Sequence, residues 1–215
     1  MTNITQKIWE LISNDITLQK NLARKLVNVR ALAKYLIKQY NLKASLDSVI
    51  TAIRRYESEE KFEESSNTIE EALKGSNVST RSKIACLTLR ENSSNAKYIH
   101  ALLEDKQLGK DGSIRISKGS EYLKIVINED DLEKVKEKLS ETVIIEVIPN
   151  LAEIVVFLNK KGMMTPGICA RIMNEISCQG VNILEIITAL PEVLVYVNKA
   201  DLVKSHDALF KLCCK

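Results

Sequence analysis

The feature that most constrains the fold is the order of strand-like and helix-like segments after residue 78, because this order occurs twice. Runs rich in Ile, Val and Leu favour strands, and apolar residues three or four positions apart favour helices. In the first copy we expect strands at 83–89, 113–117, 122–127 and 143–148, and helices at 95–105 and 130–139. This is the ferredoxin-like βαββαβ order, in which two helices cover one face of a four-stranded sheet.

The second copy follows at an offset of 70 residues when Ile84 is matched with Ile154. Its expected strands are 153–158, 181–189 and 193–197, and its expected helices are 166–178 and 201–212. Because no closing strand follows, we expect an unpaired sheet edge along 193–197. This edge predicts a homodimer in which two molecules pair their sheets.

The residues before this repeat have helical periodicity only, in four amphipathic segments. Gly75, Ser76 and Asn77 then interrupt the pattern. We therefore predict an α+β chain with a helical domain at 1–77 and two tandem ferredoxin-like units at 78–150 and 151–215. With 45% hydrophobic and 27% charged residues, the chain is suited to compact folding.

Charge is concentrated at the N-terminal end. Residues 1–56 contain ten Lys and Arg residues but only Glu10, Asp15 and Asp47 as acids. An acidic segment follows, with seven glutamates between Glu57 and Glu71. A local basic excess attracts polyanions, whereas the acidic segment opposes them.

Several classes of protein are disfavoured. No apolar run approaches the roughly 18 residues of a membrane span, and the first residues lack a secretory pattern, so we expect a cytoplasmic protein without membrane contact. The five cysteines and two histidines show no metal-ligand spacing. No phosphate-binding glycine loop or nucleophile with a base is present. We therefore expect no metal, no cofactor and no enzymatic activity.

The second copy resembles an ACT domain, the amino-acid-sensing type found at the regulatory end of aspartokinases. The residues that carry the resemblance are Gly162, Met163, Pro166, Gly167, Ile168, Ala170, Ile172, Gly180, Val181, Asn182, Ile183, Val195, Tyr196, Val197, Asp201 and Leu202. The first copy resembles this domain only in its order of elements, and its loop at 90–96 has neither Pro nor Gly. The resemblance implies two tandem ACT units, the first of them degenerate.

A ligand site is expected at the start of the helix at 166–178. Pro166 suits a first helical position, and Gly167 allows a ligand to approach the backbone. The free N–H groups at such a helix start attract a carboxylate. The resemblance implies a small amino acid held between the loop at 160–168 of one unit and a facing unit. The candidate residues are Gly162, Met163, Met164, Thr165, Pro166, Gly167, Ile168 and Asn182.

Structural roles remain open for these residues. Pro and Gly also cap helices that bind nothing, and Asn182 also suits a turn. Met163 and Met164 equally suit a hydrophobic core.

The helical domain resembles a helix-turn-helix unit in residues 28–36 and 45–56, with Ser45 as the cap of the second helix. Polar residues near that cap are candidates for contacts with bases, and nearby cations for contacts with phosphates. The candidate residues are Arg30, Lys34, Ser45, Ser48, Thr51, Arg54 and Arg55. A helical module for dimerisation or protein docking is the alternative.

The whole arrangement resembles a group of archaeal proteins described as predicted regulators of amino-acid metabolism. The resemblance implies a ligand-gated regulator in which a small amino acid changes how the helical domain meets duplex DNA. The alternative is a non-catalytic allosteric accessory subunit of an amino-acid biosynthetic enzyme.

Overall fold

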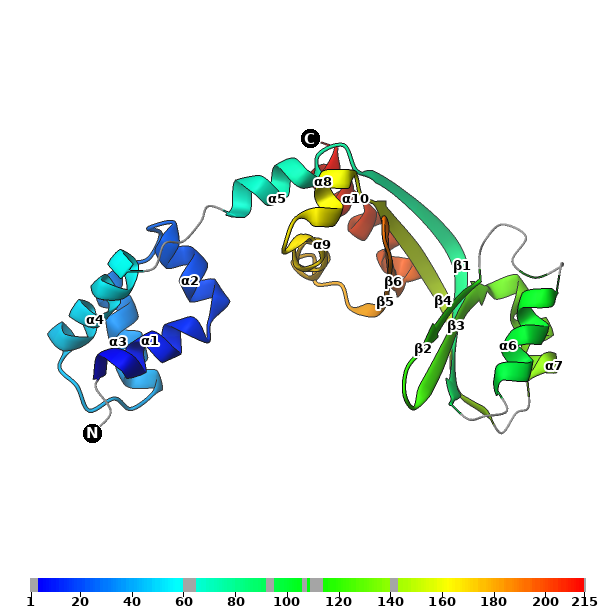
Figure 1. Ribbon diagram of the computed structural model, residues 1–215, viewed down its shortest axis with the longest axis horizontal. Helices are drawn as coiled ribbons and strands as arrows, with labels where there is room; N and C mark the ends of the chain where they lie inside the picture. The colour runs from blue at the N-terminus through cyan, green and yellow to red at the C-terminus, as the bar shows by residue number, and fades with distance from the viewer. Residues whose placement is uncertain are drawn as a thin grey trace. The chain divides into compact units, whose positions relative to one another are not determined.

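In a computed structural model the protein forms two compact units, Met1–Glu64 and Ser65–Lys215, and each is described by itself (Figure 1). The structure describes residues 4–59, 65–91, 95–105, 108, 114–139 and 143–214. The division falls earlier than the boundary near residue 78 that we expected from the sequence. The reason is helix α5 (Ser65–Leu73), which packs with the second unit.

Within residues 4–59 the first unit has four helices. They are α1 (Ile4–Ser13), α2 (Ile16–Ala23), α3 (Val29–Gln39) and α4 (Leu46–Glu59). The side chains of Asp15, Asn28 and Ser45 accept backbone N–H bonds at the starts of α2, α3 and α4. Trp9 on α1 donates its indole N–H to the carbonyl oxygen of Ala52 on α4, at 3.0 Å. The four helices expected from apolar spacing are confirmed.

The described part of the second unit holds a six-stranded antiparallel sheet in the order β2-β3-β1-β4-β6-β5. The strands are β1 (Asn77–Arg90), β2 (Arg115–Lys118), β3 (Tyr122–Asn128), β4 (Ile144–Phe157), β5 (Ile183–Ala189) and β6 (Glu192–Asn198). The other helices are α6 (Asn95–Glu104), α7 (Leu132–Lys138), α8 (Lys160–Met164), α9 (Ile168–Ser177) and α10 (Leu202–Cys213). The expected α+β class is confirmed.

The two copies of the repeat share the long strands β1 and β4 (Figure 1). The first half of β1, 77–82, pairs with the second half of β4 and closes the second copy. The second half of β1 belongs to the first copy and pairs with both β3 and the first half of β4. The closing strand that seemed to be absent after the second copy therefore precedes the first copy in the chain.

The expectation of an unpaired edge along 193–197 was wrong. Strand β6 lies between β4 and β5 and pairs with both. The edges of the described sheet are β2 and β5. The loop of the first copy at 90–96 lies only partly within the described residues, because 92–94 are outside them.

Helices cover one face of the sheet. The opposite face is concave, and its own side chains pack against one another. A separate apolar cluster on that second face includes Cys86 of β1, Val126 of β3 and Tyr196 of β6. Lys124 of β3 forms an ion pair with Glu185 of β5. In a flat sheet these strands would lie about 19 Å apart, because three strands separate them. The sheet is therefore strongly curled around this apolar cluster.

Candidate functional site

The predicted ligand loop lies after β4, at the end of the sheet where α5 packs. Asn159 caps α8 by accepting the N–H of Gly162 at 2.8 Å. The same side chain donates to the carbonyl oxygens of Ala72 and Lys74, both at 3.0 Å. Lys161 adds an ion pair with Glu71 of α5 at 3.0 Å. One asparagine thus organises the loop and holds the end of α5 against it.

Two glycines explain how α5 comes so close. A Cβ atom at Gly162 would lie 3.1 Å from the carbonyl oxygen of Ala72. A Cβ atom at Gly167 would lie 3.2 Å from Cδ1 of Ile69. In this loop the space that glycine leaves is filled by α5 and not by an open cavity.

The start of α9 differs from the sequence expectation. The helix begins at Ile168, and Gly167 is its N-cap with a φ of 88°. Because this left-handed conformation interrupts the helix, Pro166 lies outside it and does not occupy its first position. Ile168 itself is buried in the core under α5.

The remaining loop residues have divided roles. Met163 packs partly buried against the core, whereas Met164 has 81% of its surface exposed. Thr165 donates its hydroxyl to the carbonyl oxygen of Lys161 at 2.8 Å. The structure thus places one methionine in the core and leaves the other for solvent or a partner.

Asn182 does not lie with this loop. It precedes β5, whose first residue is Ile183. Ile183 pairs with Val197 of β6, and Val197 pairs on its other side with Ala152 of β4, so these three residues lie side by side across the sheet. The ligand loop follows Leu158, six residues further along. At about 3.3 Å per residue, the two positions lie about 20 Å apart along the sheet. Within one chain the structure does not bring Asn182 and the loop together.

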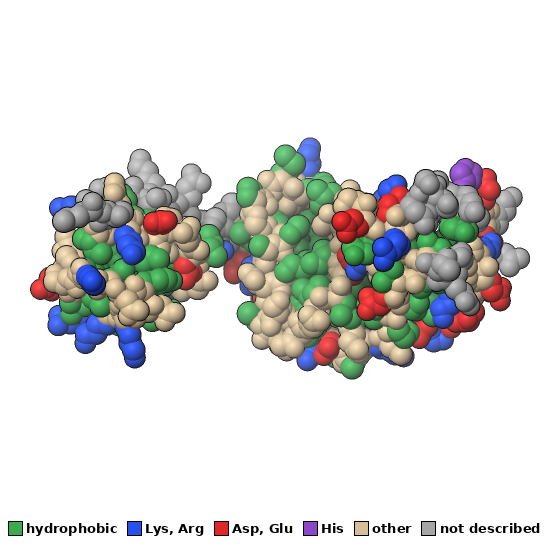
Figure 2. Space-filling model, turned by 90° about the horizontal axis from the view of Figure 1, so that it is seen from below, with side chains coloured by type: hydrophobic (Ala, Val, Ile, Leu, Met, Phe, Trp, Pro, Cys, Tyr) green, Lys and Arg blue, Asp and Glu red, His purple; other side chains and the backbone are tan. Residues whose placement is uncertain are grey.

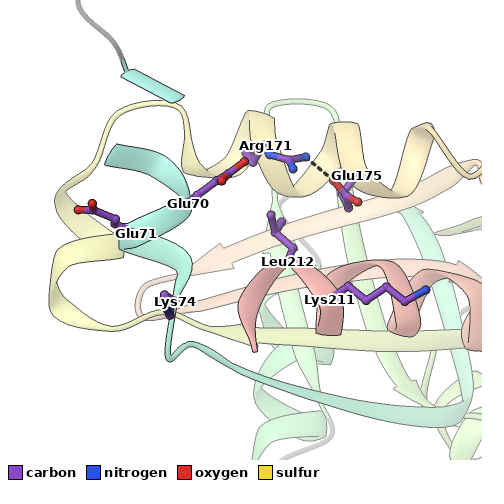
Figure 3. A pocket seen from close by; sticks show the side chains of 7 residues that line it. All are labelled: Glu70, Glu71, Lys74, Arg171, Glu175, Lys211 and Leu212. Atoms are coloured by element: carbon purple, nitrogen blue, oxygen red, sulfur yellow. Dashed lines mark hydrogen bonds and ion pairs between the residues drawn. The ribbon is translucent and has the colours of Figure 1, made fainter. Parts of the chain in front are cut away.

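A groove opens on the other side of α5, between α5, α9 and α10 (Figure 3). Its volume is about 490 Å³, within the range of small-molecule sites. Its lining consists of Glu70, Glu71, Lys74, Arg171, Glu175, Lys211 and Leu212. Sequence reasoning missed this groove because α5 packs beside α9 only in the folded chain. The paired spacing of Arg171 and Glu175 on one helix was the signal available in the sequence.

A second set of interacting polar side chains, centred on the buried Tyr196 and Glu153, lies on the curled face of the sheet. The Tyr196 hydroxyl donates to Oε2 of Glu153 at 2.7 Å, and Arg81 Nε lies 3.7 Å from Oε1. Burial, together with the negative charge of Glu153, raises the pKa of Tyr196 above its usual range. The hydrogen bond that Lys124 donates to the carboxylate of Glu185 raises the pKa of Lys124. Both side chains therefore keep their protons, and the pairs close the curled face.

The polar candidates on the helical unit lie on α3 and α4 and between them. Ser45 caps α4, the Ser48 hydroxyl donates to the carbonyl oxygen of Ser45, and the Thr51 hydroxyl donates to that of Asp47. These hydroxyls are thus engaged with their own helix. The cations Arg30, Lys34, Arg54 and Arg55 are exposed.

No protein-family model matches the sequence, and neither does any curated protein. The regulatory subunit of aspartate kinase from Thermus flavus is a structural match at 18% identity, with a TM-score of 0.53 over 65% of this chain and 99% of that chain. The ligand-free regulatory subunit from Thermus thermophilus matches at 14% identity, with a TM-score of 0.52 and the same coverage. Over 65% of its length the chain shares its fold with these regulatory subunits.

Complete aspartate kinases are matched over a smaller share of their length. The Synechocystis enzyme matches at 19% identity with a TM-score of 0.51 over 65% of this chain, but over only 27% of that chain. For the enzyme from Clostridium acetobutylicum, the share is 34% of that chain. In the described part of the protein, no helix is long and apolar enough to cross a membrane.

Proposed function

We propose that this protein is a non-catalytic regulator that binds a small amino acid in its second unit and acts as an allosteric accessory subunit of an amino-acid biosynthetic enzyme. The observation that carries the proposal is the shared fold with two aspartate kinase regulatory subunits over 99% of their length. Helix α5 supports it further. It contacts the ligand loop and is the first described element after the helical unit.

This arrangement supplies a route for the signal. A ligand that moves the loop at 160–168 changes its fit against α5, because Gly162 and Gly167 leave no spare room there. The amino acid therefore acts on α5, the element that precedes the sheet in the chain.

A thermal-shift screen of the intact protein against the twenty amino acids tests this function. A ligand that binds only the native state raises the midpoint of unfolding. We expect at least one amino acid at millimolar concentration to do so. If none does, the sensing role is wrong.

Binding of duplex DNA by the helical unit is the second candidate function. Within residues 4–59 none of the ten lysines and arginines forms an ion pair, so their charges are available to phosphates. Figure 2 shows several of the cations of this unit gathered along one edge. The capped α4 adds a helix start suited to a DNA groove.

Gel retardation at low and moderate salt separates the two candidates, because phosphate contacts weaken as salt rises. The double change Arg54→Glu and Arg55→Glu should abolish DNA binding and leave amino-acid affinity unchanged. Lys20→Glu on α2 with Arg24→Glu, the residue just after α2, is the control with the same change in charge. If the wild-type protein retards no duplex at low salt, the accessory-subunit function remains.

A homodimer remains part of the proposal, with its edge reassigned to β5. Among the described residues this strand pairs on one side only, with β6, and it exposes Ile186, with 41% of its surface accessible. Leu190, just beyond the strand, has 58% of its surface exposed. An apolar edge strand of this kind is a template for pairing with a second copy.

A further inference from the structure

The two copies of the repeat have separate hydrophobic cores on the helical face of the sheet. Of the described buried residues, sixteen form the core of the second copy with α5, and eleven form the core of the first copy. A smaller cluster on the concave face joins the two copies. Its six buried residues are Ile84, Cys86 and Val126 from the first copy and Leu151, Leu194 and Tyr196 from the second. The copies are therefore two compact bodies with a small apolar contact between them.

The covalent connection between these two bodies is made by the long strands β1 and β4, which run through both copies (Figure 1). Both strands are irregular where they pass from one copy to the other. Lys83 of β1 has a φ of 59°, Asn150 of β4 has a φ of 58°, and the pairing of the strands shifts its register between Ser82 and Ile84. A left-handed backbone is unfavourable for residues other than glycine, and such strain is concentrated at sites of conformational change. The junction of the two copies is therefore a strained bend.

An ion pair also joins the two copies across the concave face, between Lys124 of β3 and Glu185 of β5. The row of the sheet that contains Lys124 includes Glu146 of β4, and the row that contains Glu185 includes Glu153. From Glu146 to Glu153 a straight strand would extend by about 23 Å. Lys124 and Glu185 can therefore meet only because β1 and β4 bend at the junction between these two rows.

The ion pair lies close to the thiol of Cys86, which is covered on the concave face with 2% of its surface exposed. Burial raises the pKa of this thiol, and the charges of Lys124 and Glu185 act on it in opposite directions. A movement that separates the two copies would break the ion pair and uncover Cys86 together.

We propose that the junction at Lys83 and Asn150 is a hinge, and that the ion pair between Lys124 and Glu185 holds the two copies closed over the concave face. Opening separates Val126 from the residues of β6 and leaves the core of each copy intact. The hinge goes beyond the proposed function and does not depend on amino-acid binding. It gives an effector a movement to bias, because β4 leads from Asn150 to the loop at 160–168.

Alkylation of the intact protein by iodoacetamide, resolved by peptide mass spectrometry, measures the opening at Cys86. A covered thiol reacts only from an open state, so its rate follows the population of that state. We expect Lys124→Gln and Glu185→Gln each to raise the rate at Cys86 by about fivefold, the factor that a partly exposed ion pair contributes to an equilibrium. A purely electrostatic effect on the thiol would instead speed one variant and slow the other.

Lys118→Gln is the matched control. It removes the ion pair with Glu91 at 2.7 Å, which lies within the first copy and stays intact when the hinge opens. Its rate at Cys86 should therefore equal that of the wild type. Rates that change in opposite directions in Lys124→Gln and Glu185→Gln, or that match this control in both, would overturn the role of the ion pair.

The wild-type protein tests the hinge itself without any variant. Opening at the hinge exposes much less surface than global unfolding, so the rate at Cys86 should depend only weakly on urea below the unfolding transition. In water this rate should exceed the rate expected from global unfolding by about tenfold or more. If the rate at Cys86 rises with urea as steeply as the global unfolding equilibrium measured by circular dichroism, the thiol is exposed only by unfolding and the hinge is overturned.

Discussion

Gly162 allows α5 to pack closely against α8, although glycine is an unfavourable residue inside a helix. It lies inside α8, where alanine is intrinsically better than glycine by about 1 kcal/mol. Yet a Cβ atom there would crowd the backbone oxygen of Ala72, which cannot rotate away as a side chain can. The residue is therefore suited to the packing of α5 and not to the helix that contains it.

We expect Gly162→Ala to destabilise the protein by about 1–2 kcal/mol, because overpacking at α5 outweighs the gain in helix propensity. Urea unfolding measures the change in free energy. A Gly162→Ala variant more stable than the wild type would show that α5 does not pack here.

Burial raises the pKa of the Cys86 thiol to about 11, from an ordinary value of 9.0. Between these two values the unfolded chain loses the thiol proton while the native protein keeps it. Stability should therefore be unaffected below about pH 9 and fall as pH rises toward 11, by about 2 kcal/mol for this group. Cys213, also raised to about 11 by burial, contributes in the same direction.

Urea unfolding at about pH 8 and about pH 10.5 checks this prediction. We expect the Cys86→Ala variant to be less stable than the wild type at both pH values. Its free energy of unfolding should, however, fall by less than that of the wild type between about pH 8 and about pH 10.5. Equal losses in the variant and the wild type would contradict the burial of this thiol.

At the scale of elements, the sequence predicted segments better than their connections. The helices of residues 4–59 and most strands follow from local apolar spacing. The first half of β1 was missed because Ser79, Thr80, Arg81 and Ser82 form a polar run without alternation. Its role as the closing strand depends on pairing with residues that are 70 (Ser82 with Ala152) to 80 (Asn77 with Phe157) positions away, which no local pattern shows.

The continuity of β4 was missed for a different reason. Pro149 and Asn150 favour a turn, and the strands expected from apolar spacing, 143–148 and 153–158, lie on either side of them. In the structure Asn150 has a φ of 58°, and β4 shifts its register against β1 at this point. The irregularity accommodates the proline inside a continuous strand. The covering of the predicted ligand loop by α5 could not be predicted from the sequence either. It is a contact between segments about 90 residues apart.

The curl of the sheet makes Lys124 and Glu185 energetically coupled. In a double-mutant cycle with Lys124→Ala and Glu185→Ala, we expect a coupling of about 1 kcal/mol, measured by urea unfolding. A cycle of Lys124→Ala with Glu192→Ala on β6 is the control and should show almost no coupling. A coupling near zero for Lys124 and Glu185 would mean that the two strands do not meet.

At the scale of the whole molecule, we expect a homodimer through the β5 edge. Ile186→Lys should shift the protein toward monomer, because a charge on an edge strand opposes pairing with another chain. Sedimentation velocity at micromolar concentrations measures the distribution. Val203→Lys, at an exposed position of α10, is the control. A wild-type protein that sediments as a monomer with and without amino acids would contradict the dimer.

The shared fold with the two regulatory subunits supports the central claim, that the second unit binds an amino acid. Calorimetric titration of the intact protein with individual amino acids tests this claim most directly. The account predicts saturable heat for at least one of them, with one ligand bound per chain at millimolar concentration or below. The absence of heat for all twenty amino acids, in a protein that is folded by circular dichroism, would contradict it.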